Sequence, residues 1–174
     1  MSTFQGYIQV YTGEGKGKTT AALGQGLRAA GHGMSVVMIQ FMKGRRYGEI
    51  NALKKIDNFQ LIQSGRDKFV DRDHPATIDV KLAQEGWKLA RKIIREEETQ
   101  ILILDEFNLV LSYGLIPLAE AVSTLKKKPS QLEIIITGRE APEKILELAS
   151  LVSIIEERRH HFQEGIIARQ GIEY

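Results

Sequence analysis

The sequence predicts an α/β domain in which a mostly parallel central sheet is flanked by helices. Two observations lead to this prediction. Short apolar, β-branched runs alternate along the chain with longer segments of helical period, an alternation typical of βαβ units around a parallel sheet. The first apolar run also ends in a Gly-rich turn at residues 13–17, directly before a helix-forming segment that opens with Lys18 and Thr19. A strand, a Gly-rich turn and a helix in this order are the setting of a phosphate-binding loop.

Each expected strand is a run of apolar and β-branched residues, and each expected helix is a longer segment with apolar residues at helical spacing. In chain order, we expect a strand at 7–11, a helix at 18–30, strands at 35–41 and 59–63, a helix at 78–98, a strand at 101–104, a helix at 117–128, a strand at 133–137, a helix at 142–149 and a strand at 151–155.

Residues between and within these segments support the assignment. Gly31-His32-Gly33 supplies a stop signal for the first helix, and Pro117 starts a later one. The long helix that contains Trp87 has its apolar residues at helical spacing, which favours a place in the core over a cofactor site. The tail, through residues 166–168, is expected to add an edge strand.

Length and composition bound the function. The 174 residues suit a single domain, residues 1–174, and are too few for two ordinary ones. A net charge of +2 fits a site for a polyanion, but no strongly basic face with interleaved aromatics indicates a nucleic-acid partner. The absence of cysteine excludes disulfides, thiolate metal sites and Cys nucleophiles. Residues 1–5 show no targeting signal and no apolar run approaches the roughly 18 to 20 residues of a membrane span, so we expect a cytoplasmic protein without membrane contact.

The Gly-rich turn is the first chemical motif. Its backbone N–H groups can cradle phosphate oxygens, helped by the positive end of the following helix. Lys18 would reach the phosphates, and the hydroxyl of Thr19 would ligate Mg²⁺. The standard pattern G-x-x-x-x-G-K-[ST] would begin with a glycine where this chain has Thr12, and a flexible surface turn is the alternative interpretation. The residues expected to bind a nucleotide here are Gly13, Glu14, Gly15, Lys16, Gly17, Lys18, Thr19 and Thr20.

A second motif is the fully apolar run at residues 101–104, followed by Asp105 and Glu106. A buried parallel strand delivers such an acid to the carboxyl edge of the sheet, where ligands of open α/β folds bind. There Asp105 would hold Mg²⁺ opposite Thr19. Glu106 takes the usual position of a water-activating base in hydrolysing P-loop proteins. Alternatively, Asp105 is an ordinary N-cap for the next segment.

Two further segments have more than one open interpretation. Thr137 and Arg139 stand at the carboxyl end of an expected strand and could contact phosphate or a second substrate. Arg139 could equally pair with Glu140 or Glu143 at the surface. The basic loop that begins at Lys43 could meet the side chains of a substrate or be a solvated turn.

The Gly-rich turn belongs to a set of sequence blocks spread along nearly the whole chain. In order, they are residues 12–22, 28–33, 40–44, 104–106, 137–139 and several positions of 161–174. This set, with the G-x-G-K-G-K-T-T form of the loop, resembles the ATP:corrinoid adenosyltransferases. The resemblance implies a RecA-like P-loop fold and adenosyl transfer in adenosylcobalamin biosynthesis or salvage. In that reaction the cobalt(I) of a corrinoid attacks the 5′ carbon of ATP, and tripolyphosphate leaves.

The resemblance also implies roles for individual residues. The Gly-rich turn would hold the triphosphate with Lys18 as its main cation, and Thr19, Asp105 and Glu106 would hold Mg²⁺ or Mn²⁺. Arg28 would contact the ribose or base, although it should lie on the opposite side of a regular helix from Thr19, nine residues away. Catalysis would need no nucleophile from the protein, because cobalt(I) is itself a strong one.

The corrinoid side of the site follows from the same resemblance. Relatives carry two aromatics after a Thr-Gly, and apolar groups under the corrin favour cobalt(I) by withdrawing its lower axial ligand. This chain has a charged insert and then one aromatic there. It also starts only a few residues before its first strand, so we expect no N-terminal extension over the corrinoid. The expected corrinoid-side residues are Phe69, Val70, Lys43, Arg139 and His161.

The implied partners are a corrinoid substrate (cobalamin, cobinamide or cobyrinic acid a,c-diamide), a reducing flavoprotein and a second copy of the chain in a homodimer. The alternative function is a RecA-like P-loop NTPase or small-molecule kinase. In that case Glu106 would act as the base that activates water or an acceptor hydroxyl. The products distinguish the two functions, since an NTPase would form ADP and phosphate instead of tripolyphosphate.

Overall fold

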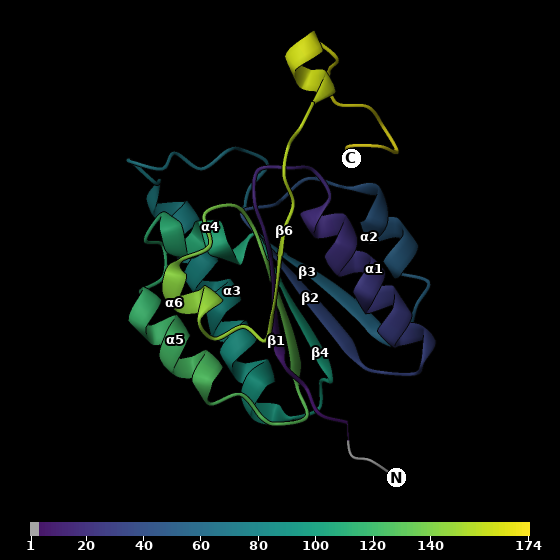
Figure 1. Ribbon diagram of the computed structural model, residues 1–174, viewed down its shortest axis with the longest axis vertical. Coiled ribbons are helices and arrows are strands. Elements are labelled where there is room, and N and C mark those ends of the chain that lie inside the picture. Colours follow the sequence, from purple (N-terminus) through teal and green to yellow (C-terminus); the bar gives the residue numbers. More distant parts are fainter. Residues whose placement is uncertain (1–3) are drawn as a thin grey trace.

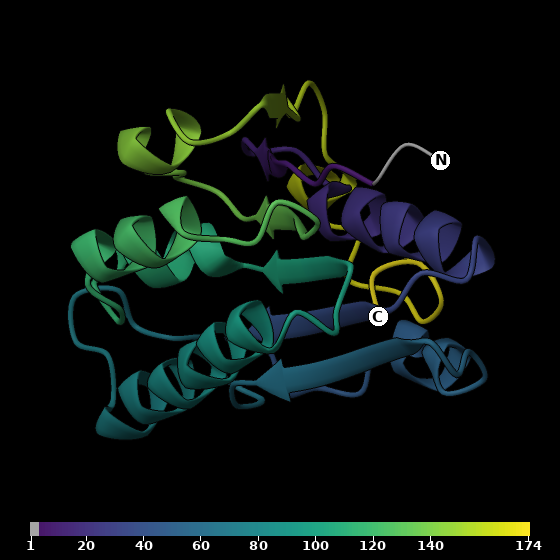
Figure 2. The ribbon, with the colours of Figure 1, turned by 90° about the horizontal axis from the view of Figure 1, so that it is seen from below.

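The computed structural model describes residues 4–174 as a sheet with helices on both faces, drawn in Figure 1 and Figure 2. All pairs of neighbouring strands in the described sheet are parallel, and the strand order is β3-β2-β4-β5-β1-β6. The strands are β1 (Ile8–Thr12), β2 (Val36–Phe41), β3 (Phe59–Ser64), β4 (Ile101–Asp105), β5 (Glu133–Thr137) and β6 (Leu151–Ile154). The architecture confirms the expected RecA-like α/β fold.

Two helix layers cover the sheet. One layer contains α1 (Lys18–Gly31) and α2 (Gly48–Leu53). The opposite layer contains α3 (Thr77–Glu96), α4 (Phe107–Ser112), α5 (Leu118–Lys126) and α6 (Glu143–Leu146). A 3₁₀ helix, η1 (His161–Glu164), lies in the C-terminal tail beyond β6. Among residues 4–174, no helix combines the length and the apolarity needed to cross a membrane.

Side chains that alternate along the strands build a core under each helix layer. On β1, Val10 packs in the core with α3 and α5, whereas Tyr11 packs in the core with α1. β4 and β5 are buried along their whole length, which explains why they read as unbroken apolar runs. The ring of Trp87 stacks on Phe107 with centroids 4.9 Å apart, so Trp87 is a core residue as expected.

The strand order gathers four functional segments at one edge of the sheet. β1 lies between β5 and β6, and β4 lies between β2 and β5. Because the strands are parallel, the segments that follow β1, β2, β4 and β5 leave the sheet at the same edge, where ligands of such folds bind. That edge therefore collects the Gly-rich turn, Lys43, Asp105 and Thr137.

The structure differs from the sequence expectation in several segments. The short helices α2 and α4 occupy segments for which the sequence predicts no helix. The helix expected at 142–149 is regular only over Glu143–Leu146. Residues 166–168 do not form the expected edge strand, because the tail folds on itself after η1 and leaves their side chains exposed. Helices of four to six residues are too short to show a helical period. Residues 1–3, part of the segment expected to lack a targeting signal, lie outside the described residues.

We expect Gly26→Ala to lower the free energy of unfolding by about 1–3 kcal/mol through overpacking. A Cβ at Gly26 would lie 2.6 Å from the ring of Phe59 and 3.0 Å from Cδ1 of Ile103. Gly24 lies in the same helix with open space around its Cβ position, so Gly24→Ala is the matched control. The control should gain up to about 1 kcal/mol from helix propensity. Urea unfolding measures both changes, and a similar gain in both variants would contradict the close packing of α1 on the sheet.

Candidate active site

The turn between β1 and α1 is folded against the segment that follows β6. Gly13 has φ 97°, and a Cβ there would lie 2.5 Å from the carbonyl oxygen of Ile155. Gly15 donates its N–H to the same oxygen at 2.7 Å, and a Cβ there would lie 2.6 Å from the carbonyl oxygen of Glu156. Thr12 still belongs to β1. The glycines stand where the turn passes the end of β6, which accounts for their shift from the standard pattern.

Lys18 lies inside this turn. Its side chain is buried, and Nζ donates hydrogen bonds to the carbonyl oxygens of Gly13 at 2.7 Å and Gly15 at 2.6 Å. Burial lowers the pKa of Lys18, and the nearby Glu106 carboxylate counteracts part of that effect. Gly17, with φ 121°, is the N-cap of the 14-residue helix α1 and ends the turn. The turn is thus preformed around an ammonium group at the positive end of a helix, an arrangement that binds phosphate.

Asp105, the last residue of β4, is fully buried beside the turn. Its Oδ1 accepts hydrogen bonds from Oγ1 of Thr19 at 2.9 Å and from Oγ1 of Thr137 at 2.6 Å. Oγ1 of Thr137 in turn accepts the N–H of Glu106 at 3.0 Å. The N-cap interpretation of Asp105 is therefore wrong, since the residue before α4 is Glu106 and its side chain makes no capping bond. The bond between Asp105 and Thr19 joins the two sequence motifs.

The oxygens of Thr19 and Asp105 suit a magnesium ion. Mg²⁺ prefers oxygen ligands and usually takes one or two carboxylates from the protein, completing its shell with water and phosphate. A hydroxyl in the first turn of α1 and a buried carboxylate at the end of β4 supply that donor set. Glu106 lies farther out, with its side chain 23% exposed, and burial together with the Asp105 carboxylate raises its pKa.

Lys43 reaches the same oxygens from the loop after β2. Its Nζ lies 2.7 Å from Oδ2 of Asp105, 3.0 Å from Oγ1 of Thr19 and 3.9 Å from Oε1 of Glu106. The ring centroid of Tyr47 lies 5.7 Å from the same nitrogen. Burial alone would lower the pKa of Lys43, but the Asp105 and Glu106 carboxylates outweigh burial and raise it. The side chain is therefore a cation at neutral pH.

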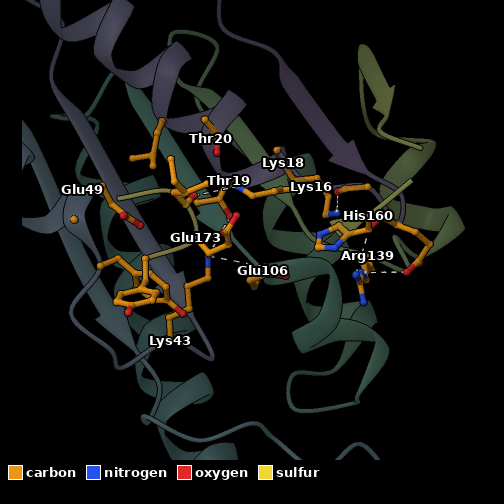
Figure 3. A pocket seen from close by; sticks show the side chains of 18 of the residues that line it. Lys16, Lys18, Thr19, Thr20, Lys43, Glu49, Glu106, Arg139, His160 and Glu173 are labelled. Atoms are coloured by element: carbon orange, nitrogen blue, oxygen red, sulfur yellow. Dashed lines mark hydrogen bonds and ion pairs between the residues drawn. The ribbon is translucent and has the colours of Figure 1, made fainter. Parts of the chain in front are cut away.

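A cavity of about 600 Å³, seen in Figure 3, is lined by several of these residues, among them Lys18, Thr19, Lys43 and Glu106. The C-terminal tail forms part of its wall through residues 171–174. Nζ of Lys16 donates to the carbonyl oxygen of Ile172 at 3.2 Å, which ties the tail to the Gly-rich turn. Within the tail, hydrogen bonds from Arg169 lower the pKa of Glu173 to about 2. A cavity of this size accommodates a ligand as large as a nucleotide.

The comparison with known proteins agrees with this geometry. Residues 4–174 match the family described as ATP:corrinoid adenosyltransferase BtuR/CobO/CobP. The chain belongs to this family. A corrinoid adenosyltransferase of Sinorhizobium sp is 38% identical over 176 residues, which cover 98% of this chain and 81% of that protein. The corrinoid adenosyltransferase of Escherichia coli strain K12 is 38% identical over 172 residues, and the corrinoid adenosyltransferase CobA of Salmonella typhimurium strain LT2 is 36% identical over 172 residues. Each alignment covers 98% of this chain and 86% of the relative.

Arg139 lies on the wall of the cavity in this member of the ATP:corrinoid adenosyltransferase family. Its Nε pairs with Oε2 of Glu14 at 3.1 Å, and its Nη2 donates to the carbonyl oxygen of Glu14 at 3.3 Å. Glu140 instead pairs with Arg72 at 3.0 Å, and Glu143 begins α6. The interpretation of Arg139 as a surface partner of Glu140 or Glu143 is therefore wrong.

Arg28 and His161, also expected at the site, do not line the cavity. Arg28, expected at the ribose or base, donates to Gln25 at 3.2 Å and lines a separate cavity of about 660 Å³ near the carboxyl end of α1. Because α1 is a regular helix, Arg28 lies away from the Gly-rich turn, as its nine-residue separation from Thr19 predicts. His161 pairs with Glu173 at 3.3 Å, whereas the neighbouring His160 lines the cavity.

The expected aromatic of the corrinoid side lies on the loop between β3 and α3. Phe69 is 96% exposed, and Val70 packs against the core. In the charged insert before them, Nε of Arg66 donates to Oδ1 of Asp79 at 2.7 Å, and Asp79 is buried in the first turn of α3. The insert thus anchors this loop to α3 and leaves Phe69 free at the surface.

Sequence reasoning missed several residues that line the cavity. Tyr47 and Glu49, at the start of α2, carry no local signal, because the path of the chain between β2 and β3 brings them to the site. His160 and residues 171–174 reach it only because the tail folds back over the Gly-rich turn. Residues 161–174 do match the family pattern in sequence, but that match alone does not indicate that they line the cavity.

Proposed function

We propose that this chain transfers the 5′-deoxyadenosyl group of ATP to the cobalt(I) of a corrinoid, in adenosylcobalamin biosynthesis or salvage. Cobalt attacks the 5′ carbon, the bond from that carbon to the phosphate oxygen breaks, and its electron pair leaves with tripolyphosphate. The observation that carries the proposal is the preformed turn around Lys18, joined to Asp105 through Thr19, in a chain that matches the adenosyltransferase family over residues 4–174.

The residues of the turn act on the leaving group. Backbone N–H groups and the Lys18 ammonium bind the triphosphate and stabilise the negative charge that grows on it as the bond breaks. Thr19 and Asp105 would hold Mg²⁺ or Mn²⁺, with Glu106 beside them, and the bound ion would neutralise phosphate charge. Arg139 and Lys16 extend the positive lining of the cavity. No side chain has to remove a proton, because the nucleophile is the metal of the substrate.

We assign the corrinoid to the surface of the loop that carries Phe69 and Val70, whose first residues pack against the backbone of Lys43 and Gly44. The free aromatic ring of Phe69 can pack on the apolar face of a corrin, where it would withdraw the lower axial ligand and favour cobalt(I). Arg139 and His161 are our candidates for polar contacts with the corrinoid side chains, whereas the contacts of Lys43 with Asp105 and Thr19 favour the phosphate side of the site for Lys43.

The remaining partners follow from the same proposal. The acceptor is cobalamin, cobinamide or cobyrinic acid a,c-diamide, and a flavoprotein supplies the electron that forms cobalt(I). We also propose that the chain works as a homodimer in the cytoplasm, where ATP is available.

The function is tested by an anaerobic assay with ATP, Mg²⁺ and chemically reduced cobalamin. The loss of cobalt(I) absorbance measures the reaction of the corrinoid, and analysis of the phosphate products identifies the leaving group. Adenosylated corrinoid together with tripolyphosphate supports the proposal. ADP and phosphate, with no change at cobalt, would contradict it and favour a P-loop NTPase.

We expect Glu106→Gln to lower adenosyl transfer less than about tenfold, because cobalt(I) attacks without general-base help. In an NTPase or kinase that uses Glu106 as its base, the same change would cost about 100- to 10,000-fold. The initial rate of tripolyphosphate release measures the effect, and the parent chain at the same Mg²⁺ concentration is the reference. A loss beyond about 100-fold would indicate that a proton transfer through Glu106 limits the reaction.

A further inference from the structure

The position of Lys43 is set by the close approach of two loops. Lys43 follows Met42, the first residue after β2, which has φ 56° and donates its N–H to the carbonyl oxygen of Ser64 at 3.1 Å. A Cβ at Gly65 would lie 2.3 Å from the backbone nitrogen of Lys43, and a Cβ at Gly44 would lie 2.6 Å from the carbonyl carbon of Arg66. The backbone on both sides of Lys43 is therefore packed against the loop after β3, and its side chain points to the end of β4.

The ammonium of Lys43 contacts the oxygens that suit a metal ion. Its Nζ lies 2.7 Å from Oδ2 of Asp105 and 3.0 Å from Oγ1 of Thr19, and Figure 3 shows it pointing toward Thr19 and Glu106. The side chain of Asp105 is 0% exposed and that of Lys43 only 17% exposed, so water screens this contact poorly. A divalent cation bound to the same two oxygens would meet the ammonium at contact distance. The two cations therefore exclude each other.

The charges around the Asp105 carboxylate explain when a divalent cation can replace the Lys43 ammonium there. The carboxylates of Asp105 and Glu106 are balanced by the ammonium groups of Lys18 and Lys43. A divalent cation alone would add excess positive charge to a poorly screened site, which is unfavourable. A triphosphate brings enough negative charge for the metal and for the displaced ammonium together.

We propose that Lys43 is a built-in cation that holds Asp105 and Thr19 in position without a nucleotide and makes metal binding depend on the arrival of the triphosphate. When the metal and the triphosphate bind together, the Lys43 ammonium leaves Asp105 and pairs with phosphate oxygens in the cavity that it lines. Its flexible four-carbon stem permits that movement. Lys43 is thus a positioning residue, and this inference rests on the proposed nucleotide site.

The test is a titration of the full chain with Mn²⁺ in the absence of nucleotide, with free Mn²⁺ measured by electron paramagnetic resonance. We expect Lys43→Met to bind Mn²⁺ at least about tenfold more tightly than the parent chain, a coupling of ordinary size between two cations. Lys55→Met is the matched control, because Lys55 is exposed outside the site and its loss removes the same charge. The control should bind Mn²⁺ as weakly as the parent. Equal affinity in Lys43→Met and the parent would overturn the inference.

Two further measurements locate the effect. The double variant Lys43→Met, Asp105→Asn should lose the gain in Mn²⁺ affinity, and a gain that persists would place the ion elsewhere and overturn the inference. Mn²⁺ without nucleotide should raise the Tm of Lys43→Met and leave the Tm of the parent unchanged. If Lys43→Met does not fold, Lys43→Gln keeps a neutral donor toward Asp105 and serves in the same titration. None of these measurements uses a corrinoid or follows turnover, so their failure is distinct from a failure of adenosyl transfer.

Discussion

Lys18→Ala is expected to lower the rate of adenosyl transfer by about 100- to 1000-fold, the usual cost of removing one preorganised charge stabiliser. In the parent chain the Lys18 ammonium is held inside the Gly-rich turn by the carbonyl oxygens of Gly13 and Gly15. It is therefore already held in the turn that we propose binds the triphosphate, where its charge can stabilise the leaving group. The variant loses that charge and also the cross-link between both carbonyls, so the turn is less well ordered.

Lys16→Ala is the matched control for this prediction. Lys16 belongs to the same turn and carries the same charge, but its side chain is exposed and donates only to the carbonyl oxygen of Ile172. We expect its loss to change the rate by severalfold at most, since a surface charge is strongly screened. Initial rates of tripolyphosphate release at saturating Mg²⁺ compare the two variants. Equal losses in both would mean that the turn acts through its summed charge, and the role given to Lys18 would then be wrong.

The parts of the site that could be predicted from the sequence are those that a local pattern defines. The turn, Thr19 and Asp105 follow from a strand end and its next residues, because a parallel strand always delivers its carboxyl end to the same edge. The central strands β4 and β5 could also be predicted, since burial on both faces makes them largely continuous apolar runs. Short helices and the tail were not, because their structure depends on contacts that a local period does not encode.

The contact of Lys43 with Asp105 shows why the rest escaped prediction. The sequence separates these residues by 62 positions. The pairing of β2 with β4 places Gln40 opposite Asp105, and Lys43, three residues after Gln40, then reaches the Asp105 carboxylate. The tail is a second case. Ile166 and Ile167 resemble part of a strand in sequence, but residues 166–168 form none, and the backbone N–H of Arg169 donates to Oε2 of Glu173 at 2.9 Å in the turn that follows. The first outcome depends on the order of the strands in the sheet, and the second on a hydrogen bond within the tail that an apolar pattern does not reveal.

We expect Asp105→Asn to lower the free energy of unfolding by about 3 kcal/mol, because it leaves the half-buried Lys43 ammonium without its partner. The same change should lower Mg²⁺-dependent adenosyl transfer by at least about 100-fold, since the carboxylate is the main protein ligand proposed for the ion. Urea unfolding without metal measures the first effect. A Mg²⁺ titration of the initial rate measures the second.

Glu133→Gln separates the two effects of the Asp105 substitution. Glu133 is also a buried carboxylate, on the neighbouring strand β5, but it stands at the amino end of the sheet and accepts hydrogen bonds from the N–H of Tyr7 and from Nε2 of Gln9. Its loss should destabilise the fold by about 1–3 kcal/mol and leave the Mg²⁺ dependence of transfer unchanged. If both variants lost transfer in proportion to stability, Asp105 would be a structural carboxylate only. A loss of transfer confined to Asp105→Asn would tie the chemistry to the carboxyl edge of the sheet, where Thr19, Lys43 and the Gly-rich turn converge.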